Sequence, residues 1–228
     1  VIGRYELSGK GEQKFPDCIE MTDPVLQVSG SSNGNNGYAG GYFGILSLND
    51  TTTYTIGDNS AEIVNINVAM KHSDYIRSYG AVAGRVTGNG LTNAMHLQNV
   101  SIISNYCGDK ETERDNARYH GGVIGELRVS VADNSKVYLE ADHIKVQDER
   151  PYAYKDDVGD ARTYRCAFGG IIGLLTNSCV AKVSDVELNT GEGQIMKGGG
   201  IVGYAEAASA VELSGTTDFS KTRYKDYW

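Results

Sequence analysis

The chain has 228 residues, of which 40% are hydrophobic and 22% are charged, a balance typical of a folded protein and not of a disordered one. Its net charge of −8 argues against non-specific nucleic-acid binding, because no basic stripe is present to displace the counterions of phosphates. No apolar run approaches the roughly 18 residues needed to span a bilayer, so we expect no membrane insertion in this segment.

Glycine is unusually frequent, with 29 residues against 3 prolines. So many glycines indicate turns and close backbone approaches, and few long helices. The 15 tyrosines outnumber the other aromatic residues. Tyrosine combines an apolar ring with a polar tip, which suits surfaces that meet sugars or other proteins.

A five-residue motif, Gly-small-x-x-Gly with apolar middle residues, recurs along the chain at 40–44, 80–84, 121–125, 169–173 and 199–203. The first glycines are spaced by 40, 41, 48 and 30 residues. An aromatic residue or histidine precedes three of the copies (Tyr79, His120 and Phe168). The glycines expected to be structural are Gly40, Gly41, Gly44, Gly80, Gly84, Gly121, Gly122, Gly125, Gly169, Gly170, Gly173, Gly199, Gly200 and Gly203.

A second element follows each of the first four motifs, at 65–68, 99–102, 143–146 and 185–188. Polar and apolar residues alternate strictly in it, which is the period of a strand buried on one face. Residues 211–213 read as a shortened copy after the fifth motif. Each repeat therefore supplies a glycine-bounded apolar strand and then an alternating strand.

Neither strand buries its apolar face alone, so stacked repeats are expected to build a continuous core. We predict an all-β, repeat-built β-solenoid, similar to a parallel β-helix. It forms a single domain with an N-terminal cap at about 1–37, repeats at about 38–78, 79–118, 119–166, 167–197 and 198–215, and a C-terminal cap or linker at 216–228. The alternative is an antiparallel β-sandwich, because 127–131 and 137–139, joined by 133–135, also read as a hairpin.

The motif copies Gly169-Gly170-Ile171-Ile172-Gly173 and Gly199-Gly200-Ile201-Val202-Gly203 resemble the Gly-Gly-aliphatic-aliphatic-Gly core of the GLUG-type repeat of bacterial surface adhesins and secreted proteins. The resemblance covers roughly 40–215 as short motifs, departs from the pattern at Ala81 and Ala83, and has longer spacing. It implies a β-helical stalk or adhesive segment on a cell surface, and it brings no catalytic residues.

The longest interval between motifs places its surplus at 146–165. Insertions in a solenoid emerge as loops on one face, often the binding face. Tyrosine rings there are suited to stack on sugars while charged groups hydrogen-bond hydroxyls, and the competing interpretation is a solvated loop. The predicted binding residues are Tyr152, Tyr154, Asp156, Asp157, Arg162 and Tyr164.

Asp156, Asp157 and Asp160 surround a glycine, as a calcium loop requires, but they lack the spacing of an EF-hand. Calcium binding there is a hypothesis beside the default of a solvated loop, and 109–115 is a second acidic segment. We expect no other cofactor.

The four cysteines, Cys18, Cys107, Cys166 and Cys179, lack the spacing of a zinc site. Cys166 and Cys179 flank one glycine-rich strand and are the first candidates for a disulfide. The alternative is that all four thiols are reduced and buried.

Catalysis has little support, because no nucleophile elbow, metalloprotease helix or phosphate loop is present. A β-helical carbohydrate-active enzyme would place carboxylates and bases along one face, and His120, Glu140, Asp142 and His143 are candidates for such roles. His120 and His143 occupy repeat positions that hold other residues elsewhere, which indicates a framework role.

The leading functional prediction is therefore a non-enzymatic, extracellular adhesin or binding segment, on the cell surface or secreted, whose solenoid loops recognise a glycan or a surface or host protein. The alternatives are a structural stalk or filament component and a β-helical carbohydrate-active enzyme. Open strand edges at the ends of a solenoid also favour self-association.

Overall fold

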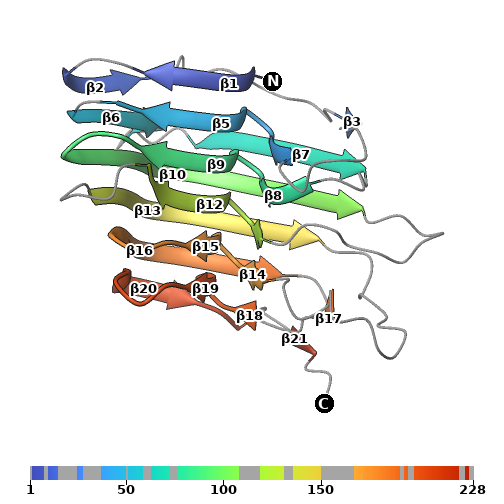
Figure 1. The fold of residues 1–228 in the computed structure, drawn as a ribbon. Helices are drawn as coiled ribbons and strands as arrows, with labels where there is room; N and C mark the ends of the chain where they lie inside the picture. Colours follow the sequence, from blue (N-terminus) through green and yellow to red (C-terminus); the bar gives the residue numbers. More distant parts are fainter. Residues whose placement is uncertain are drawn as a thin grey trace.

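The protein is described from a computed structural model, and every regular element in its described residues is a β-strand (Figure 1). The described residues are 2–7, 10–14, 25–27, 37–49, 51–58, 63–71, 76–107, 119–130, 136–149, 167–190, 193–194, 198–220 and 224–225. None of them belongs to a helix long and apolar enough to cross a bilayer.

The strands form three large parallel sheets, which we name A, B and C. Sheet A contains, in spatial order, β1 (Ile2–Leu7), β5 (Phe43–Leu48), β9 (Ala83–Gly88), β12 (Ile124–Val129), β15 (Ile172–Leu175) and β19 (Val202–Ala205). Sheet B contains β2 (Lys10–Lys14), β6 (Thr51–Ile56), β10 (Thr92–Cys107), β13 (Lys136–Glu149), β16 (Cys179–Thr190) and β20 (Ala210–Asp218), with β7 (Val64–Lys71) beside β10 and β3 (Val25–Gln27) beside β7.

Sheet C contains β4 (Gly37–Gly40), β8 (Ile76–Gly80), β11 (Tyr119–Gly121), β14 (Ala167–Gly169) and β18 (Gly198–Gly199). A further short pair joins β17 (Gly193–Gln194) to β21 (Tyr224–Lys225). The chain runs from sheet C to sheet A to sheet B and then begins again, and we call each such series a pass. Figure 1 shows the passes following one another from the blue strands to the red ones.

Each pass aligns with the next in a fixed register. In sheet A the chain of partners runs from Phe43 to Ala83, Ile124, Ile172 and Val202. This register superimposes the motif copies, since all five residues hold the same place in it. The all-β prediction is confirmed, with parallel sheets.

The antiparallel alternative is wrong for the described residues, because all of their strand pairs are parallel. Leu127 pairs with Val86 and Leu175 instead of folding back on 137–139. Val137 in turn pairs with Asn93 and Cys179. Both segments of the expected hairpin therefore belong to different parallel sheets.

The segments expected as caps also contribute strands to the sheets. Within 1–37, β1 and β2 pair in register with β5 and β6. At the other end, β20 continues to Asp218, opposite Glu187. The parallel sheets therefore extend beyond the repeats at both ends.

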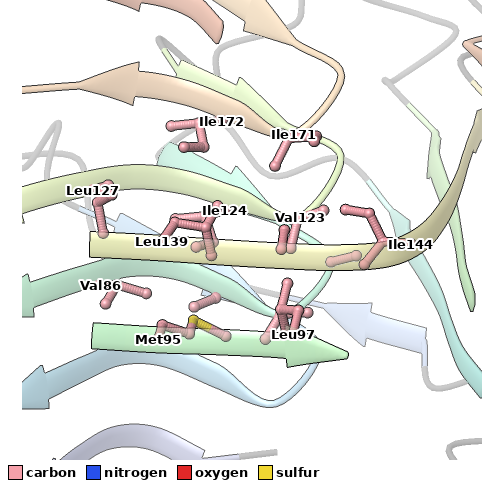
Figure 2. Close-up of a cluster of buried hydrophobic side chains, with 14 of the residues drawn as sticks. Val86, Met95, Leu97, Val123, Ile124, Leu127, Leu139, Ile144, Ile171 and Ile172 are labelled. Carbon is pink, nitrogen blue, oxygen red and sulfur yellow. The ribbon is translucent and has the colours of Figure 1, made fainter. Parts of the chain in front are cut away.

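The core lies between sheets A and B and is filled mainly by aliphatic side chains. Each pass from β5 to β16 contributes to it. Figure 2 shows Ile124 and Leu127 of sheet A gathered with Leu139 of sheet B and with Met95 of the preceding pass. These four side chains have no solvent exposure. Burying a side chain of this size contributes about 1.5–3 kcal/mol. Apolar residues at the same register position in successive passes form columns, and the burial of these columns supplies most of the free energy that stabilises the stacking of the passes.

The glycine motif forms a tight corner between sheets C and A. A Cβ on Gly80, at the end of β8, would lie 2.6 Å from the amide nitrogen of Gly125 in β12. A Cβ on Gly125 would lie 2.6 Å from the amide nitrogen of Tyr79. Because backbone packs directly on backbone here, a side chain at either position displaces a strand.

A second corner divides the long strands of sheet B. Asn99, His143 and Asp185 all have positive φ, at 52°, 52° and 47°. Before the corner Leu97 points inward, and after it Val100 points inward, so the corner residue shifts the two-residue alternation by one. After glycine, the left-handed conformation is most frequent for asparagine, aspartate and histidine, which accounts for all three residues.

The residues that precede the motif stack inside the protein. Tyr79, His120 and Phe168 are register partners in sheet C, with ring centroids 4.8 Å and 5.5 Å apart. The Tyr79 hydroxyl shares a hydrogen bond of 2.8 Å with Ser104 Oγ. His120 is fully buried in this stack.

Candidate functional site

The predicted binding segment lies outside the described residues. This holds for Tyr152, Tyr154, Asp156, Asp157, Asp160, Arg162 and Tyr164, including the residues of the calcium hypothesis. The described residues on either side nevertheless fix where the segment is attached. It leaves β13 after Glu149, which pairs with Asn105, and returns at Ala167, which pairs with Tyr119.

The same register places other connections beside it. Residues 72–75 join β7 to β8, and residues 108–118 join β10 to β11. All of these connections run from sheet B to sheet C. They are attached where the strands β7, β10 and β13 end and the strands β8, β11 and β14 begin, which we call the B–C edge.

Within the described residues, charged side chains gather on the outer face of sheet B. His96, Glu140 and Lys182 are register partners in β10, β13 and β16. Glu140 accepts from His96 Nε2 at 2.8 Å and from Lys182 Nζ at 3.0 Å. The hydrogen bond to Glu140 raises the pKa of Lys182, whose Nζ also lies 4.9 Å from the ring centroid of Tyr138.

A second group, which we call the corner cluster, comprises Asp142, His143, Ser184 and Asp185. His143 Nδ1 lies 2.9 Å from Asp142 Oδ2, and His143 Nε2 lies 4.0 Å from Asp185 Oδ2. The Ser184 hydroxyl donates to Asp142 Oδ1. The backbone N–H of Thr216 donates to Asp185 Oδ1 at 2.8 Å. The metal-binding atoms of Asp142, His143 and Asp185 all lie within 4.8 Å of one another.

These contacts shift the pKa values of Asp142 and His143 in opposite directions. Burial alone would raise the pKa of Asp142, but the hydrogen bonds from Ser184 and His143 outweigh it and lower the pKa. The hydrogen bond to Asp142, and then its charge, raise the pKa of His143. The side chain of His143 is 62% exposed, so these groups are accessible from solvent.

The candidate catalytic residues do not share one site. His120 is buried in the sheet C stack, while Glu140, Asp142 and His143 lie on the outer face of sheet B. The Ser184 hydroxyl donates to Asp142, so its proton is not directed at the imidazole as a serine nucleophile requires.

Sequence reasoning missed Lys182, Ser184 and Asp185 as members of these groups. The available signal was the alignment of the alternating elements, in which His143 and Asp185 hold equivalent places. That equivalence indicated a framework role. In the structure the equivalent places are adjacent, because each pass lies directly beside the next.

The expected disulfide between Cys166 and Cys179 is not formed. Cys179 is a free and buried thiol at the start of β16, where it pairs with Val137 and contacts Thr176 Oγ1 at 3.5 Å. Its side chain occupies an aliphatic column of the core. Cys166 and Cys18 lie outside the described residues.

Comparison with known proteins gives no matching protein-family model, and no significant match among curated proteins or solved structures.

Proposed function

We propose that the chain is a non-enzymatic, extracellular binding segment, built as a β-solenoid, that recognises a glycan through the connections at its B–C edge. The attachment of the tyrosine-rich segment at that edge, between Glu149 and Ala167, carries this proposal.

The solenoid part of the proposal is supported by the order of the strands. Successive passes through sheets C, A and B pair in parallel, and each pass contributes to the same core. The resemblance of the glycine motif to GLUG-type repeats adds an expectation of a bacterial cell-surface or secreted location.

The binding part is supported by the position of the long connections. Parallel passes bring the anchors of 108–118 and 150–166 to adjacent strands, since Asn105 pairs with Glu149. Residues from two connections are therefore attached side by side. Aromatic rings with neighbouring charged groups are the chemistry that binds sugars, and 150–166 carries both.

The test replaces 150–166 by a Gly/Ser linker of the same length as 70–77. Ala69 and Ser78 occupy the register positions of Glu149 and Ala167, so the shorter connection is compatible with the fold. The replacement begins after Glu149, because β13 continues to that residue.

Binding to a glycan array is then compared between the intact chain and the replacement. The matched control is Leu91→Ala, at an exposed position between sheets A and B. We expect loss of binding in the replacement alone. Unchanged binding in a folded replacement would show that 150–166 is not the site, and turnover of a polysaccharide would favour the enzyme alternative.

A further inference from the structure

We infer that His143 and Asp185 form a binding site for a divalent transition-metal ion such as Zn²⁺, with Asp142 orienting the imidazole. The inference uses the described residues of sheet B alone and is independent of the proposed glycan site.

The hydrogen bonds of the corner cluster determine which imidazole nitrogen is available. An ionised carboxylate only accepts hydrogen bonds, so His143 Nδ1 carries a proton and donates it to Asp142 at 2.9 Å. In the neutral imidazole, Nε2 then carries the lone pair. Ser184 donates to the other oxygen of Asp142 and so fixes the carboxylate. A carboxylate behind a metal-binding histidine is the usual arrangement in zinc sites.

The spacing beyond Nε2 suits a metal ion. Asp185 Oδ2 lies 4.0 Å from His143 Nε2, while Zn–N and Zn–O bonds measure about 2.0–2.2 Å. The two atoms therefore span an ion at a wide bond angle. At a tetrahedral angle they would be about 3.3–3.4 Å apart, which small side-chain rotations achieve. The backbone N–H of Thr216 donates to Asp185 Oδ1, and the other oxygen, Oδ2, is the one that lies near His143 Nε2.

The pair formed by His96 and Glu140, on the same face of sheet B, differs from the His143–Asp185 site in its spacing. His96 Nε2 lies 2.8 Å from Glu140 Oε2, which is a direct hydrogen bond with no room for an ion between the two atoms. His96 is therefore the matched control. With one nitrogen and one oxygen from the protein, the corner site keeps open positions for water or for a ligand from outside.

The experiment titrates the intact chain with Zn²⁺ and follows the imidazole resonances by NMR and the affinity by calorimetry. We expect the His143 resonances to shift while those of His96 do not. His143→Asn should abolish this binding, and asparagine suits the backbone because Asn99 has the same φ of 52° at the equivalent corner. Asp142→Asn should weaken it about 10- to 100-fold, and Asp185→Asn should weaken it at least as much.

His96→Asn should leave the affinity unchanged. Mg²⁺ should bind far more weakly than Zn²⁺, because it prefers oxygen ligands. The inference is overturned if His143→Asn binds Zn²⁺ as the unmodified chain does, or if millimolar Zn²⁺ leaves the His143 resonances unmoved. Equal affinity in the Asp142→Asn variant would remove the orienting role.

Discussion

Arg85 donates two hydrogen bonds to one carboxylate oxygen of Glu126, at 3.2 Å from Nε and 2.8 Å from Nη2. The two residues are register partners in β9 and β12. Glu126 is fully buried and also accepts from Ser78 and Arg128, while the Arg85 guanidinium lies 3.9 Å from the ring centroid of Tyr38. The pair thus links adjacent passes outside the aliphatic core.

Replacing Glu126 by alanine should destabilise the protein strongly. It leaves the largely buried Arg85 without its carboxylate, and breaking a buried pair in this way costs about 3–5 kcal/mol. Denaturant unfolding followed by circular dichroism measures the effect. The control is Arg128→Ala, because Arg128 is 45% exposed and a surface pair contributes about 0–1 kcal/mol. Similar losses in both variants would contradict this assignment.

Alanine substitutions at two equivalent glycines of the motif, Gly170 and Gly200, should have different effects on stability. A Cβ on Gly170 would overlap the carbonyl oxygen of Gly200 and lie 2.7 Å from Leu188 Cδ1. Among the described residues, a Cβ on the equivalent Gly200 would meet only the Phe219 ring, at 3.6 Å. Gly170→Ala should therefore cost about 1–3 kcal/mol through overpacking, while Gly200→Ala should be neutral or slightly stabilising. Thermal unfolding checks both, and equal effects would argue against the close approach.

The pKa of His143 should lie above the usual value of about 6.5, because Asp142 accepts from Nδ1 and favours the charged imidazolium. This interaction contributes stability that is complete below the unfolded-state pKa and is lost as pH rises through the raised folded-state pKa. NMR titration of the imidazole resonances, in buffer with a chelator, measures the pKa of His143. Asp142→Asn should lower the His143 pKa, and an unchanged value would contradict the contact.

Cys179 should be inert in the folded protein. Burial raises the pKa of its thiol to about 11, and only the thiolate reacts with alkylating reagents. Treatment with iodoacetamide at pH 8, followed by peptide mapping, should leave Cys179 unmodified in the native state and modified in urea. A cross-linked peptide joining Cys166 to Cys179 under non-reducing conditions would contradict the free thiol.

Much of the architecture was predictable because the repeat constrains it locally. The motif around Gly80 and Gly125 marks the corner between sheets C and A, since only glycine fits where backbone packs on backbone. The alternation in 100–102 and 144–146 marks the strands after the second corner. Local steric restrictions and burial on one face produce sequence patterns that can be recognised without knowing which strand is the partner.

The candidate site was harder to predict because it depends on register. His143 and Asp185 are separated along the chain and meet only because the passes align. The hairpin expectation failed for the same reason. Leu127 and Val137 are close in sequence, yet each pairs with strands of other passes. The spacing of the cysteines likewise gave no sign that Cys179 lies in the apolar core as a free thiol.

The most direct test of the binding proposal is a glycan-array and host-matrix screen of the intact chain, with and without calcium, beside the triple variant Tyr152→Ala, Tyr154→Ala and Tyr164→Ala. We expect a specific ligand for the intact chain and loss of its binding in the folded triple variant. A well-folded intact chain that binds nothing would contradict the account and favour a structural stalk. Equal binding by both proteins would contradict the role of these tyrosines.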